Sequence, residues 1–285
     1  MKKFFIPILC ILLPFFSFDS FAQKDVIKEK DNNQQSPYSV SLKSEVPYII
    51  ANAGLFGVGI VLVKTNKADP FTLEELNMLD PNDINSFDRG AAFNSSSSAE
   101  SARDYLFYAS SILPFATFLV DKNTKNDFLP LFVMGAEAYL ITGGLSLNSK
   151  HLFNRARPLT YNPAFPIEKR TDGSSRLSFF SGHASRTATA TFFLAKVLSD
   201  YHPDMKIGWK VGLWTTAVAI PTMTGYFRIE SGKHYNSDII VGISIGAAVG
   251  WLVPHLNKKR KKNSKLSLSS YSNSGTSGVS LAYKI

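Results

Sequence analysis

Three polar segments of this sequence contain residue types that bind and transfer phosphoryl groups. They are KHLFNRARP (150–158), FFSGHASRTATA (179–190) and FRIESGKHYNSDIIVG (227–242). The candidate residues within them are Lys150, Arg157, Ser181, Gly182, His183, Arg228, His234 and Asp238. Fixed cations stabilise the charge that spreads over a transferring phosphoryl group, and a histidine supplies a nucleophile or a proton. The pattern therefore favours phosphoryl chemistry.

His234 and Asp238 are four residues apart, so they share one face if a helix has begun by His234. The Asp238 carboxylate can then accept a hydrogen bond from one ring nitrogen of His234. The other nitrogen is left to act as a nucleophile. The alternative interpretation is a capping or solvated His–Asp pair at the start of a helix, and for an isolated pair that alternative stays open.

Ser181 and Gly182 precede a helical pattern, where free backbone N–H groups and the positive end of the helix dipole favour an anion. His183 adds a group that can donate a proton near neutral pH. An ordinary N-cap at Ser181 with a structural histidine beside it is the alternative.

A divalent metal site is the other use for two histidines and an aspartate, but the local charge balance disfavours it. Lys150, Arg157 and Arg228 would repel a divalent ion, and only Asp238 and Glu230 are at hand to offset them. The same three cations suit a bound oxyanion. We therefore expect no metal and no other cofactor.

The three segments together resemble the signature of the type 2 phosphatidic acid phosphatase superfamily. That signature has a Lys and an Arg-Pro separated by six residues, then Ser-Gly-His, then an Arg followed by His six residues later and by Asp four residues after that. Lys150 with Arg157-Pro158, Ser181-Gly182-His183, and Arg228 with His234 and Asp238 match every spacing. Phe180 and Phe227 depart from the usual Pro and Ser, at positions without reacting groups. The resemblance covers residues 100 to 255.

The resemblance implies a role for each matching residue. His234 would attack phosphorus and form a phosphohistidine, with Asp238 orienting it. His183 would protonate the leaving oxygen and then activate water. Lys150, Arg157, Arg228, Ser181 and the Gly182 backbone would hold the phosphoryl oxygens.

Six apolar segments must position these residues, at 46–63, 105–120, 128–147, 186–198, 207–227 and 238–254. Each is long enough for a helix, and the alternation typical of strands is absent from them. The sequence therefore predicts an all-α, six-helix bundle. Alternation on both sides of Asn273-Ser274-Gly275 adds a small C-terminal β-hairpin.

We expect five parts along the chain. Residues 1–22 have two lysines, a short apolar run and small residues before Ala22, which is typical of a signal peptide, although an uncleaved anchor fits too. The other parts are a polar linker (23–45), a helix with a surface excursion (46–104), the phosphatase-like core (105–257) and a basic run with the hairpin (258–285).

The apolar segments suit a membrane bundle, but Glu137, Lys196 and Lys210 lie in or near them, so a water-soluble bundle stays open. If the signal is cleaved and 46–63 does not fully cross, five spans put the candidate site outside and the KKRKK run (258–262) inside, as the positive-inside rule prefers. If 46–63 also crosses, that parity inverts.

The leading hypothesis is a metal-independent phosphatase of the bacterial cell envelope that hydrolyses phosphate monoesters or diphosphates, with a lipid phosphate as the expected substrate. A soluble periplasmic acid phosphatase and a non-catalytic membrane component that binds or transports phosphate are the alternatives. Net charge is +9, yet no nucleic-acid motif is present, so nucleic acid is not an expected partner. The residues do not specify the lipid.

Overall fold

The computed structural model of the chain describes residues 36–39, 42–65, 69–259, 266–273 and 276–283. The expected signal peptide (1–22) and most of the expected linker lie outside these ranges. The long helices are α2 (Leu42–Thr65), α4 (Ser97–Val120), α5 (Phe128–Phe153), α7 (Gly182–Tyr201), α8 (Ile207–Glu230) and α9 (Asn236–Asn257). The short helices are α3 (Leu73–Met78) and α6 (Ile167–Thr171), and the strands are β1 (Leu266–Asn273) and β2 (Thr276–Tyr283).

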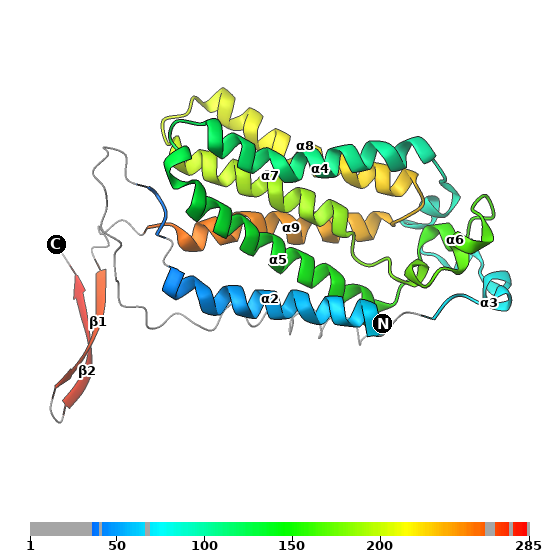
Figure 1. Cartoon of the computed structure of the whole chain (residues 1–285), viewed down its shortest axis with the longest axis horizontal. Helices are drawn as coiled ribbons and strands as arrows, with labels where there is room; N and C mark the ends of the chain where they lie inside the picture. The colour runs from blue at the N-terminus through cyan, green and yellow to red at the C-terminus, as the bar shows by residue number, and fades with distance from the viewer. Residues whose placement is uncertain (1–35, 40–41, 66–68, 260–265, 274–275, 284–285) are drawn as a thin grey trace.

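The six long helices correspond one to one with the six apolar segments, and they lie side by side in one elongated bundle (Figure 1). Helix α7 is at its centre, where it packs against α4, α5, α8 and α9. Phe118, Leu131, Met134, Phe193 and Val197 fill the core between them and are almost fully buried. The predicted all-α bundle is therefore confirmed within the described residues.

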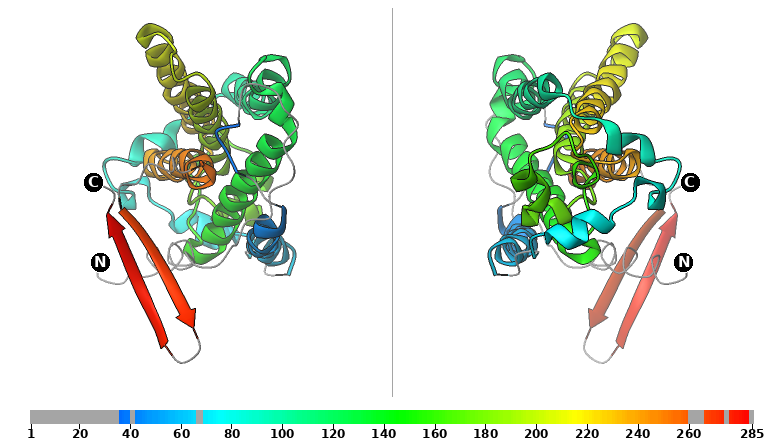
Figure 2. Two further views of the ribbon diagram at one scale, coloured as in Figure 1. Left: turned by 90° about the vertical axis from the view of Figure 1, so that its left-hand side faces the viewer. Right: turned by 90° about the vertical axis from the view of Figure 1, so that its right-hand side faces the viewer.

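The antiparallel pair β1 and β2 forms the predicted hairpin, with Asn273 opposite Thr276 next to the turn. It extends away from the helices at the end of the bundle where α9 finishes (Figure 2).

Helices α7 and α9 pack closely because α9 carries glycine at every fourth position. A Cβ added at Gly242, Gly246 or Gly250 would lie 2.8, 2.0 or 2.5 Å from a backbone oxygen of α7 or its N-cap, namely that of Ser181, Ser185 or Thr189. Only glycine permits this approach, as in small-residue contacts between membrane helices. The contact fixes the start of α9 beside the start of α7.

Replacing Gly246 with alanine is expected to lower stability by about 1–3 kcal/mol, because the new methyl group meets backbone that cannot move aside. The melting temperature of the detergent-solubilised protein measures the effect. Gly212→Ala is the matched control, since a Cβ there meets nothing within 4 Å. Equal melting temperatures for the two variants would contradict the close contact.

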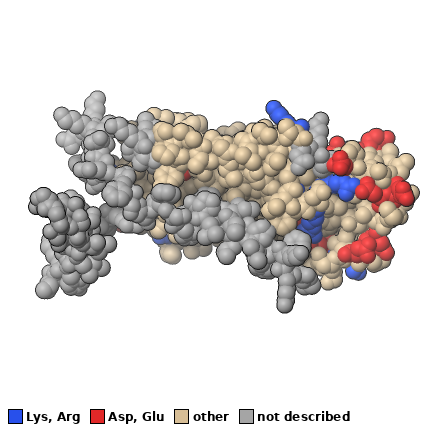
Figure 3. Space-filling view, turned by 90° about the horizontal axis from the view of Figure 1, so that it is seen from below, with Lys and Arg blue, Asp and Glu red and all other residues tan. Residues whose placement is uncertain are grey.

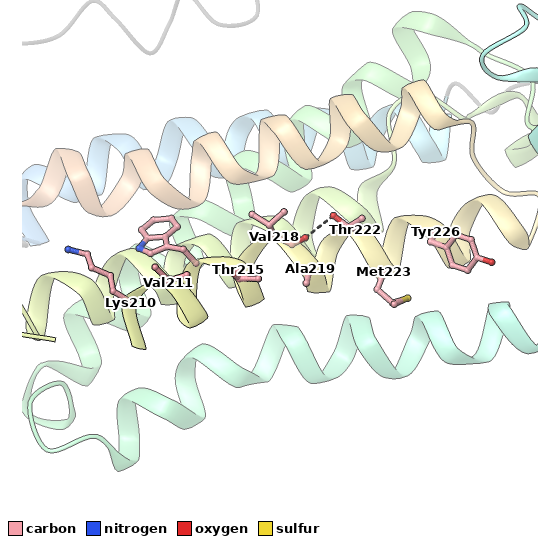
Figure 4. Close-up of a pocket in the computed structure, with 9 residues that line it drawn as sticks. Lys210, Val211, Thr215, Val218, Ala219, Thr222, Met223 and Tyr226 are labelled. Atoms are coloured by element: carbon pink, nitrogen blue, oxygen red, sulfur yellow. Dashed lines mark hydrogen bonds between the residues drawn. The ribbon is translucent and has the colours of Figure 1, made fainter. Parts of the chain in front are cut away.

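Within the described residues, three segments are long and apolar enough to cross a membrane, namely Val46–Thr65 in α2, Lys125–Thr160 around α5 and Asn236–Asn257 in α9. Helix α8 adds an exposed apolar face: Trp209, Val211 and Val218 are at least half exposed. That face bears a hollow of 1040 Å³ between Lys210 and Tyr226 (Figure 4). In Figure 3 the tan middle of the bundle lacks charge, and acidic residues gather at the end near α3. These surfaces suit a lipid environment.

Helix α2 lies along the bundle beside α5, where Gly143 and Gly144 make room for Phe56 and Leu55 (Figure 1). Asn52 donates a hydrogen bond of 3.2 Å to the buried carboxylate of Glu137 across this contact. The segment 46–63 therefore shares the course of the other long helices. This arrangement fits the alternative in which that segment also crosses the membrane.

Two parts expected to be peripheral contact the bundle. Tyr38, within the expected linker, is buried and donates a hydrogen bond to Asp200 at the end of α7. Residues 69–96, which include most of the expected surface excursion, lie at the opposite end of the bundle together with α6 (Figure 1). Ser96 N–H donates to the carbonyl of Glu230, which ties the excursion to the end of α8.

Candidate active site

The three polar segments meet at one end of the bundle, because α5 and α8 finish there and α7 and α9 begin there (Figure 1). Lys150 is in the last turn of α5, and Arg157 follows the left-handed cap residue Asn154, whose φ is 41°. Ser181 N–H donates to the carbonyl of Asp238 over 3.1 Å and links the starts of α7 and α9. The fold thus gathers all eight candidate residues.

His234 is fully buried in the turn between α8 and α9. Gly232, with a φ of 65°, reverses the chain there, and a side chain on it would meet the Asn94 carbonyl at 2.7 Å. The Nδ1 atom of His234 lies 3.4 Å from Asp238 Oδ2, and its Nε2 atom has no hydrogen-bond partner among the described residues. One ring nitrogen is therefore oriented by a carboxylate and the other is available to a substrate.

The charge state of His234 suits a nucleophile. Burial, reinforced by the charges of Arg228, Arg157 and Lys150, lowers the pKa of His234 well below its ordinary value. The ring is therefore neutral at neutral pH and keeps a lone pair on one nitrogen.

Three cations surround this histidine without neutralising partners. Lys150, Arg157 and Arg228 make no ion pair with a carboxylate in the described part of the chain. The Nε atoms of Arg157 and Arg228 are buried and lack hydrogen-bond partners there. Buried, unpaired cations are costly unless an anion joins them. The arrangement can hold an oxyanion such as a phosphoryl group.

Ser181, Gly182 and His183 form the start of α7. Ser181 caps the helix by accepting a hydrogen bond from Ala184 N–H at 3.5 Å, so the N-cap considered as the alternative is present. The capping role and anion binding by the helix start are compatible, because the backbone N–H groups of the first turn lack helical partners. The His183 ring lies 4.7 Å from the Phe107 ring of α4.

Asp238 is held by more residues than His234 alone. Its Oδ2 atom accepts hydrogen bonds from Ser178 Oγ at 2.5 Å and Tyr235 N at 3.0 Å, and its Oδ1 atom accepts one from Arg155 at 2.6 Å. The Arg155 guanidinium also lies 4.0 Å from the centre of the Tyr235 ring. The carboxylate that orients His234 is therefore fixed on both oxygens.

Asp88 of the excursion completes this network and was missed by sequence reasoning. It is 1% exposed and accepts hydrogen bonds from Arg155 at 2.8 Å, Ser237 N at 2.9 Å and Ser237 Oγ at 2.7 Å. Burial acts to raise the pKa of Asp88, but the hydrogen bonds from Ser237 and Arg155 outweigh burial and lower it. Asp88 thereby caps α9 from a distant segment. Neither its spacing nor its neighbours in the sequence could have revealed this contact.

Comparisons with known proteins agree with this geometry. The sequence model of the PAP2 superfamily matches residues 128–262, which confirms the resemblance carried by the three polar segments. The chain is 32% identical to decaprenylphosphoryl-5-phosphoribose phosphatase from Mycobacterium tuberculosis over 133 residues, covering 47% of this chain and 64% of that protein. It is 28% identical to lipid A 1-phosphatase from Porphyromonas gingivalis over 132 residues, covering 46% of this chain and 25% of that protein. The chain thus spans less than two thirds of these relatives.

Among solved structures, the chain is similar to a transmembrane PAP2 type phosphatidylglycerolphosphate phosphatase from Bacillus subtilis. The TM-score is 0.45 and the sequence identity 17%, over 78% of this chain and 100% of that one.

Proposed function

Because residues 128–262 match the sequence model of the PAP2 superfamily, we propose that this protein is a metal-independent phosphatase acting on lipid phosphates. The observation that carries the proposal is the buried His234 with a free Nε2 atom, next to Lys150, Arg157 and Arg228, at the end of a strongly apolar bundle. Such a site holds a phosphate headgroup at the membrane surface while its acyl or prenyl chain lies in the lipid.

In the proposed reaction, His234 Nε2 attacks phosphorus and the bond from phosphorus to the leaving oxygen breaks. His183 gives that oxygen a proton, and a phosphohistidine remains. Water then attacks phosphorus, His183 takes the water proton, and the P–N bond breaks to release inorganic phosphate. Lys150, Arg157, Arg228, Ser181 and the Gly182 N–H group stabilise the equatorial oxygens in both steps. Asp238 keeps His234 in the correct tautomer.

A phosphate-release screen tests the activity with phosphatidate, phosphatidylglycerol phosphate, a polyprenyl diphosphate and lipid A phosphates. We expect turnover of at least one of them, unchanged by a chelator and inhibited by vanadate, which resembles the pentacoordinate phosphorus. The relatives named as phosphatases of decaprenylphosphoryl-5-phosphoribose and of lipid A support this choice of substrates. Absence of turnover despite vanadate binding would favour a phosphate-binding component, and loss of activity with chelator would contradict the metal-independent route.

We also propose that the site faces the periplasm, because Lys258 and Lys259 follow α9 at the opposite end of the bundle and basic runs stay in the cytoplasm. If α2 crosses the membrane, this orientation places the start of α2 in the cytoplasm, which a cleaved signal peptide does not allow. A reporter enzyme active only in the periplasm, fused after Ile285, should be inactive. An active fusion would place the site in the cytoplasm.

A further inference from the structure

Arg186 is a partly buried cation that the proposed reaction does not use. It lies on α7, three residues after His183, so the two side chains share a face of the helix. Both approach the same ring: Phe107 is 4.7 Å from the His183 ring and 5.9 Å from the Arg186 guanidinium. The Arg186 Nε atom is buried, and the side chain makes no ion pair with a described carboxylate. A guanidinium whose Nε atom is buried without a partner is costly unless an anion joins it.

The Cα of Gly182 lies next to a cluster of polar side chains around Arg186. A Cβ at Gly182 would lie 2.8 Å from Ser146 Oγ and 3.5 Å from Arg186 Nη2. Ser146 is fully buried, and its hydroxyl has no hydrogen-bond partner among the described residues. The buried Tyr139 hydroxyl lies near Ser111 and interacts electrostatically with Arg186.

This cluster of polar side chains lies next to the proposed phosphate site, along the same helices. Ser146 is one helical turn before Lys150 on α5, and Tyr139 is two turns before Ser146, so the three share one face. Arg186 and Lys150 interact electrostatically as well. Ser146 and Arg186 are therefore the next polar side chains that a ligand held by Lys150 would meet between α5 and α7.

The position of Arg186 relates it to the leaving group. In the proposed reaction His183 serves the leaving oxygen, and Arg186 lies beside His183 against Phe107. An alcohol leaving group needs only a proton on its oxygen to leave as a neutral molecule. A phosphate leaving group also carries negative charge, which a fixed guanidinium stabilises.

We propose that Arg186, with Ser146 and Tyr139, forms a second anion subsite on the leaving-group side, and that the preferred substrate class is a lipid diphosphate. This proposal rests on the proposed function. His234 attacks the terminal phosphorus, the bond to the bridging oxygen breaks, and that oxygen keeps the electron pair and takes the proton of His183. The lipid monophosphate then leaves with its charge against Arg186, and water hydrolyses the phosphohistidine as before.

The test compares farnesyl diphosphate with farnesyl phosphate in the full-length wild type and in Arg186→Met. We expect kcat/KM for the diphosphate to fall by about 10- to 100-fold in the variant, and that for the monophosphate to change by less than about 3-fold. Removing a partly buried cation that has no ion pair should also raise Tm, by about 2–4 °C, so misfolding would not explain the loss. Lys210→Met, on the exposed face of α8, is the control and should change neither substrate.

Equal losses for both substrates, or an unchanged ratio, would overturn the second subsite. A wild type that hydrolyses the monophosphate but not the diphosphate would also overturn it and leave the proposed function intact. A wild type that hydrolyses neither would count against the proposed function instead.

Ligand binding to the His234→Ala variant tests the second subsite without turnover. Methylenediphosphonate should bind about 10-fold more weakly when Arg186→Met is added, and methylphosphonate should bind equally well in both. Equal weakening of the two ligands would refute the subsite.

Discussion

Replacing His234 with alanine is expected to lower phosphate release at least about 10⁴-fold, because the proposed covalent route has no other nucleophile. The fold should survive, because Asp238 keeps its hydrogen bonds from Ser178, Tyr235 and Arg155 when the His234 ring is removed. Phosphate release from the preferred lipid and Tm, measured on the same detergent preparation, test both statements.

His255→Ala is the matched control, since that histidine lies in the last turn of α9 at the far end of the bundle and should leave activity unchanged. Acid-labile radioactive phosphate should be trapped on the wild type after rapid quenching and be absent from His234→Ala. A variant that keeps more than a tenth of wild-type activity would refute the nucleophilic role.

The lowered pKa of His234 gives this reaction a specific pH dependence. A histidine with its ordinary pKa would become protonated and lose nucleophilicity as the pH falls through about 6.5. Because burial and nearby cations keep His234 neutral, its protonation should not limit kcat/KM until well below that pH. The free energy of unfolding, unlike kcat/KM, should fall as the pH drops through the ordinary pKa of histidine. The unfolded histidine takes up a proton there while the folded one does not, so acid destabilises the fold.

The helices of this protein could be predicted from long apolar runs, but their ends could not. Helix α4 begins at Ser97, well before the apolar run at Tyr105, because a serine of the expected surface excursion provides its cap: Ser96 accepts a hydrogen bond from Ala99 N–H. Helix α5 likewise continues to Phe153 and carries Lys150. Polar residues at helix ends belong to caps or to the site, and hydropathy alone does not separate these from loops.

The eight candidate residues could be predicted because the chain gives them fixed local spacings, which the helix ends convert into proximity. Arg155 and Asp88 had no such spacing. Arg155 lies between Lys150 and Arg157, yet only the fold brings it within 2.6 Å of Asp238. Asp88 reaches α9 from a segment 149 residues before Ser237. Such contacts depend on how the excursion docks, which the local sequence pattern does not encode.

Replacing Asp238 with asparagine is the second change with a large expected effect, a loss of about 10³-fold in kcat. Asparagine keeps the shape but removes the charge that orients His234 and pairs with Arg155, so the correct tautomer is no longer enforced. Arg155 is left with Asp88 alone, and we expect a cost of about 1–3 kcal/mol in stability. Asp204→Asn, in the exposed turn after α7, is the charge-matched control.

Asp88→Asn separates orientation from electrostatics in this network. Asp88 touches neither His234 nor the three site cations in the described structure; it holds Arg155 and Ser237, which in turn hold Asp238 and the start of α9. If the network acts by positioning, Asp88→Asn should lower kcat by about 10-fold and leave KM unchanged, because the cations proposed to bind phosphate are untouched. A rise in KM with constant kcat would instead mean that Asp88 shapes substrate binding. Combined with Asp238→Asn it should add little further loss, since both changes act through the same carboxylate.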